Sequence, residues 1–561
     1  MLRTFLPPAI TGVLLWAAFF PLDLGSIGFF ALVPWLTLVR APLSRRRRYL
    51  AAYLGAFTFF ALATNWVRVA HPMMYLSWAG LSLVLPLFWV FGLDLIRRFD
   101  RLGVPLAVSV PVVWVALEYF RAHFPTGFPF LKPLGFYQMI GFGWYFLGYT
   151  QHSVLQLIQI ADIGGVYAVS FVVAAVNGLL ADWAFRQDFI CRKLGFVAIK
   201  EVEGGSIFRA IASSAFVAVL LAGSLAYGFM RLNHPEFTPG PRVAAIQGSV
   251  PQGEKMMKGE GSLQQIYGAL HMKALKTSDK PDLIVWPETC FASDWLEVPQ
   301  GQKATERFAN DTKYTETFFE QTFSKVPVTH QRPVLLGLTG YEWEDGKEWR
   351  YNSALFITGH GTKIGRYDKM HLVPFGEYVP LKETFPFMQN FTPYEKDYTC
   401  RPGEHWTRFP LITADGRKFT FACLICYEDS DPYLARQYVA SEPVDFLVNI
   451  SNDGWFDGTE EHEEHLAISQ FRAVEARRAL VRSVNMGISA VIDSDGAVIA
   501  LPNKSWSASK KVEAVVSAVV PIDSRNSLYS RLGDWIPGVC WVLLTVVFVI
   551  SRLRKAATPA V

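Results

Sequence analysis

Phe421-Ala-Cys-Leu-Ile-Cys-Tyr-Glu428 is the stretch that decides the fold of this 561-residue chain. An apolar run of this length is typical of a buried strand, and it ends at Cys426, where polar residues begin. A rigid strand aims its last side chain, and the turn that follows exposes it, which is the placement a nucleophile needs. The run therefore predicts a buried sheet with Cys426 as a candidate nucleophile at the end of a strand.

Two other stretches supply groups that could activate such a thiol. Asp282-Leu-Ile-Val-Trp-Pro-Glu288 is a second apolar run that ends in a carboxylate, and Lys369 follows in a loop rich in Gly and Pro. Glu288 can accept the thiol proton as a general base, while Lys369 favours the thiolate and stabilises an oxyanion. We therefore predict Glu288, Lys369 and Cys426 as catalytic residues of an acyl transfer. The residues expected to position the lysine or the substrate are Glu377, Glu428 and Tyr427.

Cys423 lies three residues before Cys426, a spacing that also occurs in redox and zinc sites. Side chains three apart on a strand point to opposite faces, and no second CxxC pair completes a metal site. We therefore expect Cys423 in the core. The paired histidines of Glu460-Glu-His-Glu-Glu-His465 are interpreted as solvated or capping, and no metal is predicted.

The chain is too apolar for an ordinary soluble protein, with a mean hydropathy of +0.21 and 18% charged residues. Apolar stretches gather at its two ends, and several approach the roughly 20 residues that cross a bilayer. We expect eight membrane spans, at residues 4–22, 24–39, 49–67, 69–93, 102–117, 163–181, 210–230 and 535–551. Residues 1–231 are then a seven-helix membrane domain, residues 232–534 a catalytic domain, and residues 535–561 a last span and tail.

Basic residues follow every even-numbered span, for example at residues 45–48 and 97–101. By the positive-inside rule, the N-terminus is cytoplasmic and the catalytic domain lies on the outer side of the membrane. The first span has no convincing cleavage site, so we expect an uncleaved anchor rather than a signal peptide. The basic clusters also explain the net charge of +4, which gives no reason to invoke nucleic acid.

Between the last two spans, short apolar runs alternate with longer segments compatible with helices. This alternation predicts an α/β domain with largely buried sheets. The expected strands are residues 242–247, 282–286, 334–338, 354–358, 419–426, 445–450, 488–492 and 497–501, and the expected helix is residues 460–478. The polar stretch 300–332 is interpreted as a peripheral insertion.

A series of motifs in this chain resembles the apolipoprotein N-acyltransferases, the membrane-embedded branch of the carbon–nitrogen hydrolase (nitrilase) superfamily. They include Glu118-Tyr-Phe-Arg121, Ile246-Gln-Gly-Ser-Val-Pro-Gln252, Trp286-Pro-Glu288, Lys369-Met-His-Leu-Val-Pro-Phe-Gly-Glu-Tyr-Val-Pro380, Ile425-Cys-Tyr-Glu428 and Ile450-Ser-Asn-Asp-Gly-Trp-Phe456. The resemblance covers most of the chain and implies a polytopic α-helical membrane domain beside an αββα sandwich. Met256 and Glu464 depart from the family pattern, outside the three catalytic positions.

The resemblance implies that an acyl chain passes from a phospholipid, through a thioester on Cys426, to the N-terminal amine of the diacylglyceryl-cysteine of an apolipoprotein. It implies a place in the bacterial inner membrane with the catalytic domain on the periplasmic side. We expect a monomer without a cofactor. Two alternatives stay open: a membrane-tethered amidase that hydrolyses small amides, and a non-catalytic membrane scaffold with a nitrilase fold.

The segment 381–391 is unusually apolar for a long connection beside the predicted lysine. Pro386 and Asn390 argue against a regular element, so we interpret the segment as a mobile arm between the active site and the bilayer. The side chains expected to contact acyl chains are Phe385, Phe387, Met388 and Phe391.

Overall fold

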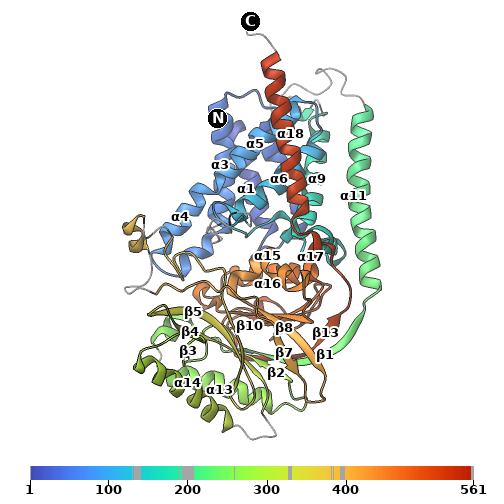
Figure 1. The fold of residues 1–561 in the computed structure, drawn as a ribbon. Helices are drawn as coiled ribbons and strands as arrows, with labels where there is room; N and C mark the ends of the chain where they lie inside the picture. Colours follow the sequence, from blue (N-terminus) through green and yellow to red (C-terminus); the bar gives the residue numbers. More distant parts are fainter. Residues whose placement is uncertain are drawn as a thin grey trace. The chain divides into compact units, whose positions relative to one another are not determined.

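The computed structural model describes residues 2–128, 131, 141–187, 189–191, 207–257, 260–325, 331–380, 382, 384–391 and 398–557. The chain divides into two compact units (Figure 1). Unit 1 comprises Met1–Arg68, Tyr75–His234 and Arg531–Val561, and unit 2 comprises Val69–Met74 and Pro235–Ser530.

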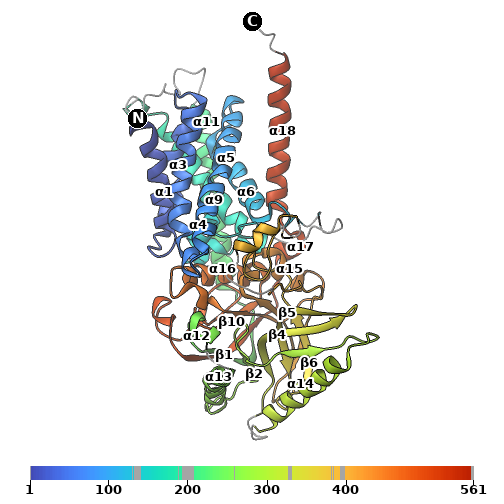
Figure 2. The ribbon, with the colours of Figure 1, turned by 90° about the vertical axis from the view of Figure 1, so that its left-hand side faces the viewer.

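Unit 1 is helical, and its long helices run side by side (Figure 2). The α-helices are α1 (Leu2–Ala18), α2 (Val33–Leu36), α3 (Arg45–Ala63), α4 (Met74–Val84), α5 (Pro86–Arg101), α6 (Leu106–His123), α7 (Leu155–Ile158), α8 (Ala161–Gly164), α9 (Val166–Ala184), α11 (Ile207–Asn233) and α18 (Trp535–Ala557). Short 3-10 helices connect them: η1 (Gly25–Phe29), η2 (Thr37–Val39), η3 (Asn65–Val69) and η5 (Leu147–Gln151).

Within the described residues, four helical segments are long and apolar enough to cross a membrane: Met74–Arg101, Val166–Ala184, Ile207–Asn233 and Trp535–Leu553. The prediction of eight spans is therefore supported at four positions and not at the other four. The first predicted span corresponds to a shorter apolar helix, Thr4–Ala18. The second corresponds to another shorter apolar stretch, Gly25–Val39, which is made up of η1, α2 and η2.

Unit 2 contains two sheets. In the first, the strand order is β13-β1-β2-β4-β5-β6, and β3 pairs with β4. Its strands are β1 (Phe237–Gln247), β2 (Leu283–Val285), β3 (Trp295–Glu297), β4 (Val334–Glu344), β5 (Lys347–Ile357), β6 (Lys363–Asp368) and β13 (Ala514–Asp523).

The second sheet has the order β12-β11-β10-β9-β8-β7. Its strands are β7 (Phe409–Ile412), β8 (Lys418–Ile425), β9 (Phe446–Ser451), β10 (Ala479–Val484), β11 (Ala490–Ile492) and β12 (Val498–Ala500). Its three central strands, β8, β9 and β10, run parallel, so their carboxyl ends meet at one edge of the sheet.

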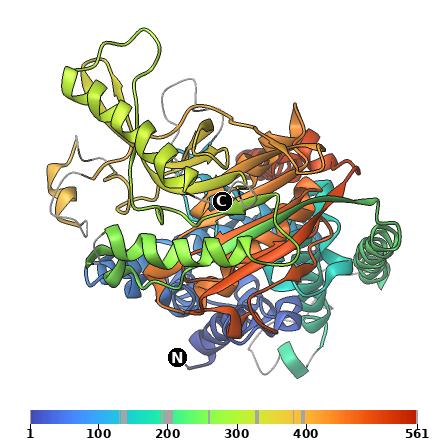
Figure 3. The ribbon, with the colours of Figure 1, turned by 90° about the horizontal axis from the view of Figure 1, so that it is seen from below.

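Helices cover the outer faces of both sheets. α13 (Glu260–Leu275) and α14 (Glu306–Ser324) lie across the first sheet, as Figure 3 shows from below. α15 (Pro432–Ala440) and α16 (Glu461–Ala476) pack on the second. The remaining short helices are α12 (Gln252–Met257), α17 (Leu528–Leu532), η8 (Pro386–Phe391), η9 (Cys426–Ser430), η10 (Asp453–Phe456) and η11 (Ser507–Ser509). The main core fills the space between the sheets, with residues such as Val285, Phe356 and Leu447 fully buried. This is the expected αββα arrangement.

All eight predicted strands are confirmed, although β1, β4 and β5 extend five to seven residues beyond their predicted bounds at one end, and the predicted helix is α16. Strands β3, β6, β7, β10 and β13 were not predicted. The polar stretch 300–332 contains α14, which buries Phe319 and Phe323 against the first sheet.

Candidate active site

Cys426 stands where β8 ends and η9 begins. Its φ of +54° lies in the left-handed region, where a residue other than glycine costs about 1–3 kcal/mol of strain. The surrounding contacts compensate for this strain: the Asn449 amide donates to the Cys426 carbonyl oxygen at 2.9 Å, and the Ile425 N–H donates to Glu428 at 2.7 Å. The turn therefore presents the thiol at the edge of the sheet, as the sequence predicted for a nucleophile.

Glu288 and Lys369 meet in a buried contact. Glu288 follows β2 after Trp286 and Pro287, and Lys369 directly follows β6. The Lys369 ammonium lies 3.3 Å from Glu288 Oε1 and 2.9 Å from Glu377 Oε2, and its side chain is 1% exposed. The lysine therefore lies between two carboxylates, which brings together three of the residues singled out in the sequence.

Asn352, on β5, holds the two carboxylates in place and was not predicted. Its amide nitrogen donates to Glu288 Oε1 and to Glu377 Oε1, both at 2.6 Å. The backbone carbonyl oxygen of Asn352 accepts from the backbone N–H of Lys369 at 2.9 Å. A lone Asn in a strand carries no sequence signal, so only the fold identifies this residue.

Glu428 and Tyr427 act on the loop that carries Lys369. The fully buried Glu428 carboxylate accepts from the N–H groups of Met370 and His371, at 2.7 and 3.1 Å. The Tyr427 ring lies 5.5 Å from the Lys369 ammonium, and its hydroxyl donates to the Leu372 carbonyl at 2.8 Å. Both residues thus fix the lysine loop to the turn that carries Cys426.

The charges of the site favour a neutral thiol and a charged lysine. Burial raises the pKa of the Cys426 thiol well above its ordinary value; the Glu288 charge raises it further, and Lys369 lowers it without restoring it. Burial alone lowers the pKa of Lys369, but Glu288 and Glu377 outweigh burial and hold it well above its ordinary value. Lys369 thus acts in the direction predicted from the sequence, but burial and Glu288 outweigh it. The roles of Glu288 as a base and of Cys426 as a nucleophile remain predictions, which the raised pKa of the thiol makes specific: a thiol in this state needs a base in order to react.

Cys423 is fully buried, as predicted, and all six cysteines are free thiols. The interpretation of the 460–465 motif as solvated or capping is wrong, because His462 and His465 are 0% and 1% exposed. These histidines face buried carboxylates rather than solvent: His462 lies 3.7 Å from Asp453, and His465 lies 2.8 Å from Asp429.

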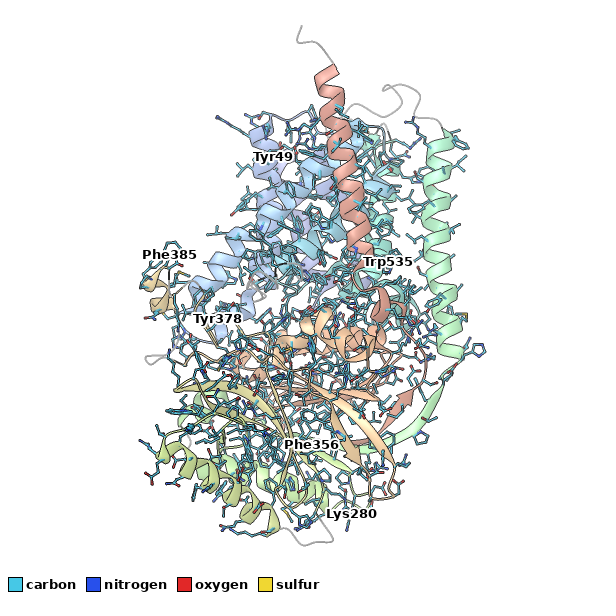
Figure 4. The ribbon with its side chains drawn as sticks, viewed as in Figure 1. Tyr49, Lys280, Phe356, Tyr378, Phe385 and Trp535 are labelled. Atoms are coloured by element: carbon cyan, nitrogen blue, oxygen red, sulfur yellow. The ribbon has the colours of Figure 1, made fainter. Side chains whose placement is uncertain are left out.

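The apolar arm is only partly described. Pro386–Phe391 forms the 3-10 helix η8, so the segment contains a short regular element that the sequence did not predict. η8 projects from the body of unit 2 in Figures 1 and 3, and Phe385, labelled in Figure 4, precedes it. Phe385 and Phe387 are 47% and 57% exposed, whereas the side chains of Phe391 and Met256 lie outside what the structure describes.

Two family models match the chain. One, described as the apolipoprotein N-acyltransferase N-terminal domain, matches residues 11–179, and the other, described as carbon-nitrogen hydrolase, matches residues 242–520. Together they cover parts of both units. The carbon-nitrogen hydrolase match contains all three predicted catalytic residues.

Several full-length relatives carry the name apolipoprotein N-acyltransferase. The one from Geobacter metallireducens is 31% identical over 567 residues, covering 99% of this chain and 96% of the relative. The one from Rhodopirellula baltica is 28% identical, covering 94% of this chain and 93% of the relative. The crystal structure of Nit3 from Saccharomyces cerevisiae, a nitrilase superfamily member, matches 52% of this chain and 93% of its own at 19% identity, with a TM-score of 0.34 that is too low to carry weight.

Proposed function

Because the chain belongs to the apolipoprotein N-acyltransferase family, we propose that it moves an acyl chain from a phospholipid to the N-terminal amine of the diacylglyceryl-cysteine of an apolipoprotein. In this proposal the acyl chain passes through a thioester on Cys426. The observation that carries it is the buried Glu288–Lys369 contact, whose two charges both act on the Cys426 thiol. A base, a cation and a nucleophile are the three parts that such an acyl transfer needs.

In the first half-reaction, the Cys426 sulfur attacks the ester carbonyl of the phospholipid while Glu288 takes the thiol proton. The raised pKa of the thiol makes this coupled proton transfer necessary, because little thiolate exists beforehand. Lys369 and backbone N–H groups beside Cys426 stabilise the oxyanion of the tetrahedral intermediate. The intermediate then expels the alcohol of the lysophospholipid, which takes its proton from Glu288, and the thioester remains.

In the second half-reaction, the amine of the apolipoprotein attacks the thioester carbonyl. Glu288 accepts a proton from the attacking nitrogen, and the Cys426 sulfur leaves and regains its proton. The product is an amide, which is more stable than the thioester, so this step runs forward. The enzyme returns to its starting state, as ping-pong chemistry requires.

Glu377 and Asn352 hold Glu288 and Lys369 in their positions during both half-reactions. Glu377 holds the Lys369 ammonium at 2.9 Å, so the lysine remains charged when Glu288 takes a proton. Asn352 donates a hydrogen bond to each of the two carboxylates, which favours their ionised forms. Positioning of this kind lowers the barrier without changing the chemistry.

Unit 1 supports a location in a membrane. α11 and α18 expose large apolar side chains over most of their length, including Val219 at 72% and Val542 at 63%. Such surfaces are typical of helices that face lipid. We propose eight spans in the bacterial inner membrane, with unit 2 on the periplasmic side, from the basic clusters after the even-numbered spans.

A labelling experiment tests this orientation. Cysteine introduced beside Arg45 should be shielded from an impermeant thiol reagent in intact spheroplasts, whereas cysteine at Tyr314, an exposed residue of α14, should react. The reverse pattern would place unit 2 in the cytoplasm and remove the periplasmic substrate from the proposal.

The aromatic arm supplies an apolar surface for the acyl donor. Phe385 and Phe387 are exposed side by side, with ring centroids 6.0 Å apart. A pair of exposed aromatic rings next to a catalytic loop gains apolar contact when an acyl chain lies against it. The arm therefore favours a lipid donor over the small amides of the amidase alternative.

A two-substrate assay tests the proposed function. Purified protein in mixed micelles is given phospholipid and a synthetic peptide with an N-terminal diacylglyceryl-cysteine. We expect the peptide to gain one acyl chain by mass, with release of an equal amount of lysophospholipid. Release of ammonia from small amides without acylation of the peptide would instead establish the amidase.

A further inference from the structure

A buried cluster of charged side chains lies behind the nucleophile, outside the set already described. Two carboxylates, Asp429 and Asp453, face two cationic side chains, His465 and Arg482. All four side chains are 0–1% exposed. They come from four separate segments, η9, η10, α16 and β10, that meet at the carboxyl ends of the parallel strands.

Each cation of the cluster bridges both carboxylates. His465 Nε2 lies 2.8 Å from Asp429 Oδ1, and its Nδ1 lies 3.3 Å from Asp453 Oδ1. Arg482 places one guanidinium nitrogen 2.9 Å from Asp429 Oδ2 and the other 3.4 Å from Asp453 Oδ2. The arrangement is a closed ring of alternating charge. Opening it at one member leaves a buried charge without its partner, which is costly.

The cluster is connected to Cys426 along two paths. Asp429 belongs to η9, the same short helix that Cys426 begins. Ile425, the last residue of β8, pairs with Ile450 on the parallel strand β9, so Cys426 follows β8 beside the end of β9 at Ser451. The Ser451 hydroxyl donates to Asp453 Oδ1 at 2.5 Å. Ser451 also lowers the pKa of the Cys426 thiol, so the same side chain acts on both the cluster and the nucleophile.

We propose that His465 is a positioning residue for the nucleophile: together with Arg482 it clamps Asp429 and Asp453, and through these two carboxylates it fixes the turn and the Ser451 hydroxyl that hold Cys426. The proposal rests on the proposed role of Cys426 as nucleophile. It also explains how the strained backbone at Cys426 persists, since its φ of +54° needs surroundings that enforce it.

The charges are consistent with a protonated His465. Burial and the nearby Arg482 lower its pKa, but Asp429 and Asp453 outweigh them and hold the pKa well above the ordinary value. Other groups that face it are Glu461, one turn earlier on α16, and Ser469, one turn later, which donates to Asp429. With both ring nitrogens protonated, His465 donates to both carboxylates at once.

A divalent metal ion is the competing occupant, because donor atoms of Asp453, Glu461 and His465 all lie within 4.8 Å of one another. A metal would require His465 to give up its Nδ1 proton and would bring a dication next to Arg482, which already faces Asp453. The imidazolium serves the same two carboxylates without this repulsion. We therefore assign the cluster to a clamp rather than to a metal site.

The test measures the reactivity of Cys426 in the full-length protein in detergent. Cys426 is partly exposed and the other five cysteines are buried, so iodoacetamide should modify it selectively, as peptide mapping can verify. We expect His465→Gln to move the pH profile of alkylation upward by about one unit, about a tenfold slower reaction at pH 8. Loss of the cation leaves the two carboxylates less compensated, and their charge disfavours the thiolate.

The matched control is His271→Gln, which removes another buried imidazole, on α13, from outside the cluster. We expect it to lower the melting temperature but to leave the alkylation profile unchanged. An unchanged profile in folded His465→Gln would overturn the proposal. So would a stoichiometric metal ion in the purified protein whose removal by a chelator changes the profile.

If His465→Gln does not fold, the same alkylation test is made on Ser451→Ala. This variant removes the hydroxyl between the charged cluster and the thiol and leaves all four charges of the cluster paired. Alkylation at least about threefold slower supports the proposal, and wild-type alkylation contradicts it. The readout needs neither lipid nor apolipoprotein. The alkylation result can therefore contradict the role of His465 without contradicting acyl transfer, and the acyl-transfer assay can fail without contradicting the role of His465.

Discussion

Replacing Glu288 with Gln separates its role as a base from its role as a hydrogen-bond acceptor. In the wild type, Oε1 accepts from Asn352 at 2.6 Å and from Lys369 at 3.3 Å, while Oε2 accepts from the Asn452 N–H at 3.0 Å. A glutamine has one acceptor oxygen, so in either orientation its NH₂ group meets a donor. At least one buried hydrogen bond is lost, which costs about 1–3 kcal/mol of folding free energy.

The effect on the reaction should be larger than the effect on the fold. Lys369 keeps Glu377 as a partner, so the variant should fold with a modestly lower melting temperature. Without a base, the Cys426 thiol keeps its proton, and loss of general base catalysis costs about 10²–10⁴-fold in rate. A single-turnover experiment with phospholipid, followed by intact mass, measures acylation directly.

The control for Glu288→Gln is Glu348→Gln, an exposed carboxylate on β5 that should acylate at the wild-type rate. Acylation of Glu288→Gln within about threefold of wild type, in a protein that melts cooperatively, would refute its assignment as the base. Loss of activity without a folded protein would be uninformative, so the melting curve is recorded on the same sample.

Three further changes test the other parts of the site. Cys426→Ala should abolish formation of the acyl-enzyme, whereas Cys423→Ala should keep most of it. Because the pKa of the Cys426 thiol is raised, the rate of its alkylation should still be increasing as the pH passes 9. Lys369→Arg should lose at least about 10²-fold in acylation, because a planar guanidinium does not replace a compact ammonium between two carboxylates; wild-type rates would contradict this. Phe385→Ser with Phe387→Ser should lower kcat/KM for phospholipid at least about tenfold, since each ring contributes up to about 1.5–3 kcal/mol of apolar burial, and should leave alkylation of Cys426 unchanged. Unchanged lipid turnover in that double variant would remove the arm from the account.

The strands that carry the catalytic residues could be predicted because their apolar runs end abruptly in a polar residue. β8 ends before Cys426, and β2 ends shortly before Glu288. The same pattern therefore predicts both the strand and the candidate functional residue at its end. β10 was missed because Arg482 interrupts its apolar pattern. That arginine is tolerated inside the sheet because Asp429, more than 50 residues earlier in the chain, pairs with it. A sequence read locally does not reveal such a partner.

The same limit applies to Asn352 and to the membrane spans. Asn352 gains its role from two carboxylates that reach it from other strands and loops, so its own neighbours in sequence give no signal. Long apolar stretches of sequence predicted which parts of unit 1 are helical, but they did not predict where each helix ends. Residues 25–39 are therefore divided into short helices, and α4 and α5 meet at Pro86 within one predicted span.

The most direct test of the account is to trap the covalent intermediate. Purified protein is incubated with phospholipid in the absence of any amine acceptor, quenched in acid, and analysed by intact mass and peptide mapping. We expect one acyl chain, removable by neutral hydroxylamine, on the peptide that contains Cys426. An acyl chain on any other residue, or none at all while a peptide acceptor still becomes acylated, would contradict the thioester on which the proposed mechanism depends.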